Sequence, residues 1–230
     1  MKKKKICNIV LNDAQDVIFR DEFKPILDLI PSNSKVLDLG CGDGSLGYQL
    51  ITTKSCEVSG VDVSKEVVKK AKEKGIVASV GDLEEGLEFP DETFDYVVIC
   101  DVLEHVREPL YLLKEALRVS KRYVIVAFPN FGYFVCRVQA LRGEFPKAIH
   151  FGMKWYNSAH ITLFSLKDFL NALKELNFNV KVSRSGHIAS KKIPRFLIRM
   201  FPTLFAGVCV LELEKGEGWN YKNVRDYYDV

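Results

Sequence analysis

The alternation of short apolar runs with amphipathic segments between residues 35 and 128 constrains the fold of this 230-residue chain more than any other feature. The runs are four to six residues long, rich in valine and isoleucine, and apolar at nearly every position. Strands of this kind are covered on both faces, which is typical of a parallel sheet with helices on either side. The predicted strands are Val36–Leu39, Val58–Val61, Ile76–Val80, Tyr96–Cys100 and Tyr123–Phe128.

The segments between these runs are predicted to be crossover helices. Ser64 stands where a helix N-cap belongs, and Gly75 stands where that helix would end. After Pro109, leucines repeat at helical spacing in "LYLLKEALRV". Because strands and helices alternate along the chain, we expect an α/β fold with a doubly wound, mostly parallel sheet.

The regular pattern ends at Pro129 and returns at Ser165. The stretch between them is dense in aromatic and basic residues, and we expect it to form a lid over the strand ends. Ser165 and Asp168 make a capping box, which predicts a helix start at this point. Two further strands are expected at Asn179–Ser183 and Phe205–Leu213.

The length suits one main domain with short additions at both ends. The insertion at 184–204 is basic and amphipathic, and we expect it to pack on its own domain, with a membrane-surface or partner-docking helix as the alternative. The C-terminal tail at 216–230 is expected to be loosely ordered or held against a neighbouring chain. The predicted organisation is an N-terminal helical extension at 1–30, a domain at 31–215 with a lid at 130–164 and an insertion at 184–204, and a C-terminal tail at 216–230.

Charge and composition exclude several classes of protein. The 33 basic and 30 acidic residues nearly balance, so we expect no nucleic-acid partner. No apolar run approaches the length of about 18 residues that a transmembrane helix needs, so no membrane span is expected. The basic start at Lys2–Lys5 lacks the apolar segment of a secretory signal and is expected to be solvated. The six cysteines form no C-x-x-C pair, which favours reduced thiols in the cytoplasm.

The glycine-rich stretch "VLDLGCGDGSLG" follows the first predicted strand and is typical of a cofactor-binding loop. Gly42, Gly44 and Gly47 fit the G-x-G-x-x-G spacing of a dinucleotide site. Asp38 followed by Gly40, Gly42 and Gly44 also fits a loop for a sulfonium cofactor such as S-adenosylmethionine. In that loop glycine lets the backbone approach the methionine part, and the carboxylate favours its ammonium group.

Three more acids follow successive strands and favour the sulfonium cofactor, because a pyrophosphate would be repelled by so many carboxylates. Asp62 is suited to accept both ribose hydroxyls, Asp82 the adenine amino group, and Asp101 lies next to the methionine end. Any one of them alone would be more typical of a helix cap, but open α/β sheets bind ligands at this edge. The predicted cofactor contacts are Asp38, Gly40, Cys41, Gly42, Gly44, Asp62, Val63, Gly81, Asp82, Leu83, Cys100 and Asp101.

Two histidines are candidates for acting on a substrate. His105 follows the fourth strand in "DVLEHV", and His160 lies in the predicted lid in "WYNSAHITLF". Either can serve as a general base, or instead hold a loop carbonyl or the lid. Tyr133, Trp155 and Tyr156 are predicted to line an acceptor pocket, with simple packing as the alternative. Because the four histidines lack metal-ligand spacing, we expect no metal.

Four stretches together resemble the class I S-adenosylmethionine-dependent methyltransferases, specifically those of type 11. They are "VLDLGCGDG", "GVDVS", "GDLEEGLEFPDETFDYVVICDVLEHVREP" and "RVSKRYVIVAFPN", and the resemblance covers roughly residues 30 to 215. It implies a Rossmann-like sheet of seven strands with an antiparallel last strand. It also implies a cytoplasmic enzyme that transfers a methyl group to a small-molecule or lipid-like acceptor and releases S-adenosylhomocysteine.

A narrower resemblance is to the MetW family, whose members are associated with the homoserine acyltransferase of methionine biosynthesis. It rests on "GDLEEGL", "FPNFG" and "WYNSAHITLFSLKDF", whereas "DVLEHV" is more similar to ordinary small-molecule methyltransferases. Two functions therefore stay open: an active methyltransferase, or a non-catalytic or regulatory partner of an acyltransferase. A homodimer is the other partner considered, and an NAD-dependent oxidoreductase is disfavoured by the row of acids.

Overall fold

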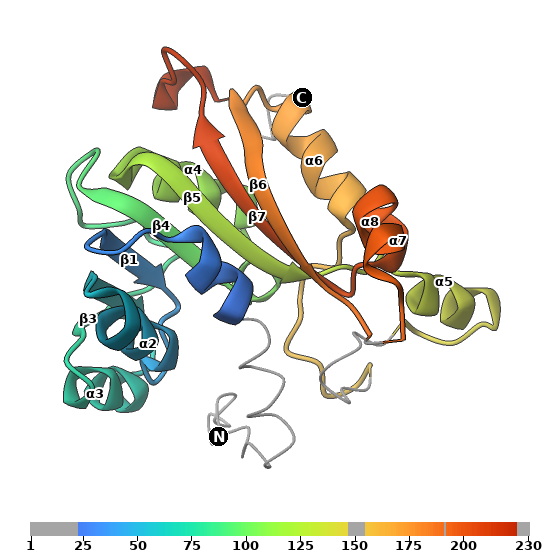
Figure 1. Ribbon diagram of the computed structural model, residues 1–230, viewed down its shortest axis with the longest axis horizontal. Helices are drawn as coiled ribbons and strands as arrows, with labels where there is room; N and C mark the ends of the chain where they lie inside the picture. The colour runs from blue at the N-terminus through green and yellow to red at the C-terminus, as the bar shows by residue number, and fades with distance from the viewer. Residues whose placement is uncertain (1–22, 147–154, 191, 225–230) are drawn as a thin grey trace, which may run out of the picture.

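A central sheet with helices on both faces forms the molecule in a computed structural model that describes residues 23–146, 155–190 and 192–224 (Figure 1). Of the predicted N-terminal extension at 1–30, residues 23–29 are helical, and the part before residue 23, with Lys2–Lys5, lies outside the described residues. In the ranges that the structure describes, no helix has the length and apolarity needed to cross a membrane.

The sheet has seven strands in the order β3-β2-β1-β4-β5-β7-β6. Strands β1 to β5 pair in parallel, and β7 runs antiparallel to both β5 and β6. The doubly wound, mostly parallel sheet with an antiparallel last strand is therefore confirmed. The strands are β1 (Lys35–Leu39), β2 (Glu57–Asp62), β3 (Val77–Val80), β4 (Phe94–Cys100), β5 (Ser120–Pro129), β6 (Val180–Ile188) and β7 (Val208–Lys215).

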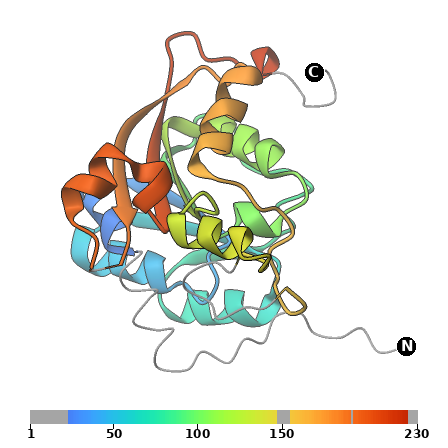
Figure 2. The same cartoon turned by 90° about the vertical axis from the view of Figure 1, so that its right-hand side faces the viewer.

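The helices divide between the two faces of the sheet (Figures 1 and 2). Residues 23–29, α2 and α3 contribute to one buried apolar cluster, and α4 and α6 contribute to the other. The helical elements are α2 (Ser45–Lys54), α3 (Lys65–Glu73), η1 (Leu103–His105), α4 (Pro109–Val119), α5 (Phe134–Leu141), α6 (Leu166–Glu175), α7 (Arg195–Met200), α8 (Pro202–Phe205) and η2 (Tyr221–Asn223).

Strand β4 shows why the predicted strands are apolar at nearly every position. Val97 and Ile99 pack into the cluster under α4 and α6, whereas Tyr96 and Val98 pack into the cluster under α2 and α3. Because successive side chains of a strand point to opposite faces, both sets must be apolar when both faces are covered.

Two helix starts illustrate what local sequence does and does not specify. At α6 the predicted capping box is confirmed: Ser165 Oγ accepts the Asp168 N–H, and the Asp168 carboxylate accepts the Ser165 N–H. At α3, Ser64 is the N-cap residue as predicted, but its side chain makes no capping hydrogen bond within the described part of the chain. The carboxylate of Asp62 instead accepts the Ser64 N–H at 2.9 Å.

The C-terminal strands differ from the prediction. Strand β6 continues to Ile188, into the expected insertion, because its polar residues pair with charged residues of β7, as Arg184 does with Glu212. The prediction that the last strand begins at Phe205 is wrong. Pro202 begins the short helix α8, and β7 begins only at Val208.

The chain after β7 packs on the helices that cover the sheet. Trp219 contacts the apolar cluster of α4 and α6, and Val224 is buried. The ammonium group of Lys114 donates to the Val224 carbonyl at 3.2 Å. The expectation of a loosely ordered tail is therefore wrong for residues 216–224, and residues 225–230 lie outside the described part.

Asn130 is buried directly after β5, and its side chain connects three separate segments of the chain. Its Oδ1 accepts the N–H groups of Gly132 at 2.9 Å and Leu166 at 3.1 Å. Its Nδ2 donates to the carbonyls of Thr203 at 3.0 Å and Ala206 at 2.8 Å. The start of the lid, the start of α6 and helix α8 are thus held together by one amide.

Asn130→Ala is expected to lower the free energy of unfolding by about 2–4 kcal/mol, because it leaves buried donors and acceptors without partners. Urea denaturation followed by circular dichroism measures this change. Asn171→Ala, on the exposed side of α6, is the matched control and should alter the free energy of unfolding by less than about 0.5 kcal/mol. Equal effects of the two substitutions would contradict the role assigned to Asn130.

Candidate functional site

The carboxyl ends of β1, β2, β3 and β4 lie side by side, and each carries one of the predicted acids. In the sheet register Leu39 of β1 pairs with Val61 of β2 and Ile99 of β4, and Asp62 pairs with Val80 of β3. Parallel pairing therefore brings the four acids to one edge of the sheet, as the sequence predicts. They are Asp38, Asp62, Asp82 and Asp101.

The glycine loop crosses this edge and is anchored to β2. The N–H groups of Gly40 and Cys41 both donate to the Val61 carbonyl, at 2.8 and 3.1 Å. Gly40, Gly42 and Gly44 have φ values of +75°, +52° and +78°, which favour glycine. No described atom lies within 4 Å of the point where a Gly42 Cβ would stand. The loop tip therefore offers bare backbone next to open space, which suits close approach of a ligand.

Asp62 connects the loop to the end of β2. One carboxylate oxygen accepts the Gly42 N–H at 3.0 Å, and the other accepts the Ser64 N–H at 2.9 Å. The second bond is close to the alternative role of a helix cap, because Ser64 is the N-cap residue of α3. A carboxylate has about four acceptor positions, so two remain for a pair of ligand hydroxyls.

Asp38 is a buried carboxyl group beneath the glycine loop. Burial, with a smaller contribution from the nearby charge of Asp62, raises the pKa of Asp38 from 3.8 to about 7. A positive group bound nearby would favour the ionised form. The position therefore fits the ammonium group of an amino-acid ligand better than it fits a phosphate.

The end of β3 has the features expected around a nucleobase. Asp82 is exposed and accepts the Glu84 N–H at 2.9 Å, and the Gly81 N–H donates to the Asp62 carbonyl at 3.1 Å. Val63 is 70% exposed, whereas Leu83 packs in the core. A cavity of about 560 Å³ adjoins Asp82 on the side of Tyr111 and Glu115, and Asp62, Val63 and the glycine loop do not line it.

The two cysteines of the predicted site are at least partly buried in the structure. Cys41 is buried, and burial together with the charges of Asp38 and Asp62 raises its thiol pKa to about 12. The thiol therefore stays protonated and is a poor nucleophile. Cys100 is half-buried, and its sulfur lies 3.8 Å from an oxygen of Asp101, at the end of β4.

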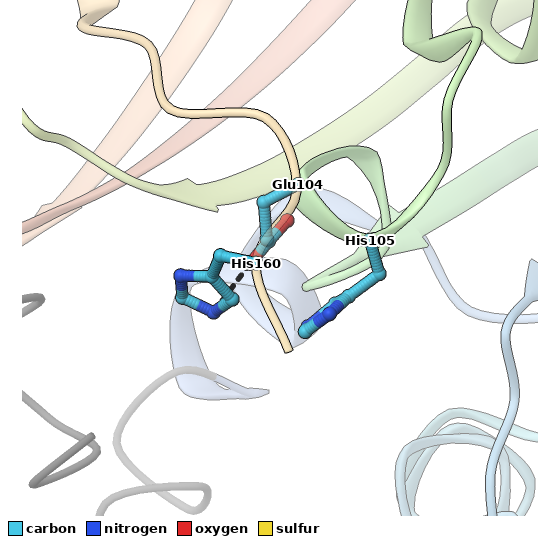
Figure 3. Close-up of side chains that lie close together, drawn as sticks. All are labelled: Glu104, His105 and His160. Carbon is cyan, nitrogen blue, oxygen red and sulfur yellow. Dashed lines mark ion pairs between the residues drawn. The ribbon is translucent and has the colours of Figure 1, made fainter. Parts of the chain in front are cut away.

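His105 and His160 lie next to each other just beyond β4, with Glu104 between them (Figure 3). Their ring centroids are 4.8 Å apart, and Nε2 of His160 lies 3.9 Å from Oε1 of Glu104. Each of the three residues has one potential metal-ligand atom that lies within 4.8 Å of those of the other two. The side chains of Glu104 and His160 are buried, whereas His105 is exposed.

Main-chain hydrogen bonds hold the segment around His160 against η1. The Ile161 and Thr162 N–H groups donate to the Glu104 carbonyl, at 2.8 and 3.2 Å. A ring nitrogen of His105, Nδ1, lies 3.0 Å from the Ala159 carbonyl, so this nitrogen carries the proton. His105 thus holds a loop carbonyl through Nδ1, as one of the two predictions has it, and its Nε2 can still accept a proton.

Burial shifts the pKa values of the two buried members of the cluster in opposite directions. Burial and the neighbouring His105 lower the pKa of His160 to about 4, and burial with the charge of Asp101 raises the pKa of Glu104 well above its usual range. The ring of His160 is therefore neutral near pH 7, and a neutral imidazole has a lone pair that can receive a proton or ligate a cation.

Glu104 is the functional candidate that the sequence did not single out. It directly precedes His105 in "DVLEHV", between the core residues Leu103 and Val106. The only sequence signal for its role is this position next to a candidate histidine. Its proximity to His160 depends on how residues 155–164 pass over η1, which no local pattern predicts.

The predicted acceptor-pocket aromatics lie in different surroundings. Tyr133 is buried at the start of α5, with its ring centroid 4.7 Å from that of Phe134. Trp155 and Tyr156 are exposed and lie edge to face, 5.6 Å apart. Among these residues only Tyr133 is enclosed by the described chain, and residues 147–154 of the predicted lid lie outside it.

Comparison with known proteins identifies the class and then the family. The chain has the class I S-adenosylmethionine-dependent methyltransferase fold: it superposes on magnesium protoporphyrin IX methyltransferase from Synechocystis PCC 6803, solved with S-adenosylhomocysteine, with a TM-score of 0.59. That match covers 91% of this chain and 90% of the other at 19% identity. The chain belongs to the MetW family, since the model described as "Methionine biosynthesis protein MetW" matches residues 20–213.

Two curated relatives align at higher identity. The chain is 34% identical over 173 residues, 70% of its length, to the bifunctional methionine biosynthesis protein MetXA/MetW of Rhodopirellula baltica. It is also 34% identical over 120 residues, 50% of its length, to demethylmenaquinone methyltransferase of Bacillus licheniformis. The aligned part makes up 28% of the first relative and 51% of the second.

Proposed function

We propose that this chain is an S-adenosylmethionine-dependent methyltransferase for a small-molecule or lipid-like acceptor. The observation that carries the proposal is the row of acids along the glycine loop, which suits a cation-bearing nucleoside and would repel a pyrophosphate. Membership of a family with the methyltransferase fold supports it, as does the resemblance to demethylmenaquinone methyltransferase.

The proposed binding mode assigns one part of the cofactor to each strand end. Asp62 accepts the ribose hydroxyls with its two remaining acceptor positions. Asp82 accepts the adenine amino group, and Val63 covers a face of the ring. Asp38 and Asp101 lie at the methionine end. The contacts from the loop and its neighbours are Gly40, Cys41, Gly42, Gly44, Gly81, Leu83 and Cys100.

In the proposed mechanism, residues of the lid and of η1 position the methyl acceptor and remove its proton. Bound S-adenosylmethionine supplies an electrophilic methyl group, so much of the catalysis can come from alignment of the acceptor atom in a dry pocket. His105 and His160 are the proposed catalytic residues, through the lone pair on a neutral ring. Tyr133, Trp155 and Tyr156 are the proposed contacts to the acceptor.

Methyl transfer from isotopically labelled S-adenosylmethionine to a panel of hydroxyl, amine and quinol acceptors tests this proposal. We expect turnover on at least one acceptor, reduced about 10²- to 10⁴-fold in His105→Asn if that ring removes the proton. His187→Asn, on β6, is the matched control and should retain full activity. No turnover on any acceptor, despite tight cofactor binding, would contradict the enzymatic proposal.

A second candidate function is that of a regulatory partner of a homoserine acyltransferase. It is supported by the relative from Rhodopirellula baltica, whose name joins MetXA and MetW in one chain. Apolar side chains exposed on and near α5 and α7 offer a surface for such a partner, with a homodimer as the alternative occupant. They include Val138, Leu141, Phe145, Phe196, Met200 and Phe201.

Co-purification with a homoserine acyltransferase and an acyl-transfer assay test the second candidate. We expect a complex whose acyl-transfer activity exceeds that of the acyltransferase alone. Leu141→Asp should abolish the complex, because it buries a charge in an apolar interface, whereas Val77→Asp on the exposed edge strand β3 should not. Activity that is unchanged by the addition of this chain would exclude the role of activator.

A further inference from the structure

We infer that Glu104, His105 and His160 form a binding site for a divalent transition-metal ion, for which Zn²⁺ is the best match. The three residues offer two imidazole nitrogens and one carboxylate oxygen, all within 4.8 Å of one another. Two histidines and a glutamate are a known ligand set for zinc. The cluster comes from two separate segments, η1 and the stretch after residue 155 (Figure 3).

The separations fit a site that contracts slightly when the ion binds. Ligand atoms around tetrahedral zinc lie about 3.4 Å apart, given metal–ligand distances near 2.1 Å. The Glu104 Oε1 to His160 Nε2 distance is 3.9 Å, so this pair needs a movement of about half an ångström. The other separations are no longer than 4.8 Å, so they need a movement of at most about 1.4 Å.

The tautomer of His105 is already the one that a metal ligand needs. Its Nδ1 donates to the Ala159 carbonyl at 3.0 Å, which leaves the lone pair on Nε2. Histidine ligands of metals almost always donate their other ring N–H to a carbonyl or carboxylate in this way. The same bond fixes the ring between η1 and the segment that carries His160.

Glu104 provides the second line of support. Its side chain is 1% exposed, and neither carboxylate oxygen accepts a hydrogen bond from another of the residues that the structure describes. Buried polar atoms are nearly always hydrogen-bonded, and a bound ion is one of the few explanations for an exception. A purely structural glutamate at this position would be expected to have donors around it.

The ion would keep coordination positions for a substrate. Three protein ligands with an exposed side at His105 are typical of catalytic rather than structural zinc sites. The site also lies next to the glycine loop, because a Cβ added to Gly40 would overlap Val102, directly before η1. This last step rests on the proposed function. The acceptor would coordinate the ion through an oxygen atom. The ion, rather than His105, would then activate that oxygen.

Zinc titration of the full, chelator-treated protein tests the inference by calorimetry, and Co²⁺ titration tests it by visible absorption. We expect one Zn²⁺ per chain, and at least a 10-fold weaker dissociation constant in both His105→Asn and Glu104→Gln. His187→Asn, a described histidine outside the cluster, is the matched control and should bind within twofold of the wild-type chain. Thermal unfolding of each metal-free variant reports whether it folds.

His105→Asn is the decisive variant because its side chain is exposed and its loss should not unfold the protein. Zinc binding that is equally tight in the wild-type chain and His105→Asn would overturn the inference, and so would no binding to the wild-type chain. Since S-adenosylmethionine is absent from this experiment, its outcome is independent of the proposed methyl transfer.

Discussion

Asp62→Ala is expected to weaken S-adenosylmethionine binding by about 10- to 150-fold, measured by isothermal titration calorimetry at pH 7.5. The substitution removes the proposed charge-assisted hydrogen bonding to the ribose, and we expect a net loss of about 1.5–3 kcal/mol. It also frees the N–H groups of Gly42 and Ser64, so the glycine loop loses its connection to the end of β2. Both effects act in the same direction on affinity.

Asp82→Ala separates ligand contact from loop support. Asp82 accepts the N–H of Glu84 in its own turn and, among the described residues, has no hydrogen bond to the glycine loop, so its loss should affect mainly the proposed adenine contact. Asp28→Ala, at an exposed ion pair on the helix at 23–29, is the control and should bind like the wild-type chain. If both Asp62→Ala and Asp82→Ala remain within about threefold of wild-type affinity, the assigned site is wrong.

Asp38→Asn is expected to stabilise the cofactor-free protein at pH 8 by about 2–4 kcal/mol. Burial raises the pKa of Asp38 from 3.8 to about 7, so between these pH values the folded chain binds more protons than the unfolded chain. The free energy of unfolding contributed by Asp38 therefore falls as pH rises from about 4 to about 7. Asparagine has no charge to bury and avoids this loss.

Urea denaturation at pH 4 and pH 8 measures the effect, and the difference between the variant and the wild-type chain should shrink towards pH 4. The same variant should bind S-adenosylmethionine more weakly, because it lacks the charge that the proposed binding mode places near the ammonium group. Higher stability with lower affinity would be typical of a residue kept for ligand binding. A variant that is less stable than the wild-type chain at pH 8 would show that Asp38 has a structural role instead.

The parallel part of the sheet was predictable because its signals are local. An apolar run that is covered on both faces needs valine or isoleucine at successive positions, as Val97, Val98 and Ile99 show. The capping box of Ser165 and Asp168 is likewise complete within four residues. The acids of the site were predictable for a related reason: each one lies at or within two residues of the end of a strand, and parallel pairing brings these ends together.

The antiparallel edge was harder to predict because long-range pairing decides it. Polar residues in β6 obscure the alternation expected of a strand, yet Arg184 is stabilised there by the buried Glu212 of β7. The segment after β7 likewise contains few apolar residues, and Trp219 packs against an apolar cluster whose residues come from distant parts of the chain.

The acceptor side was the least predictable part of the site. His105 and Glu104 follow β4, but His160 reaches them only because Ile161 and Thr162 donate to the Glu104 carbonyl. Spacing along the chain therefore contained no sign of a ligand cluster. The expectation that the histidines bind no metal came from that spacing, and their three-dimensional arrangement is the basis for the opposite proposal.

Calorimetric titration of the wild-type chain with S-adenosylmethionine, S-adenosylhomocysteine and NAD tests the central claim most directly. The row of acids and the glycine loop predict one site per chain for each of the two adenosyl ligands and no measurable binding of NAD. Tight binding of NAD without binding of S-adenosylmethionine would contradict this account of the site.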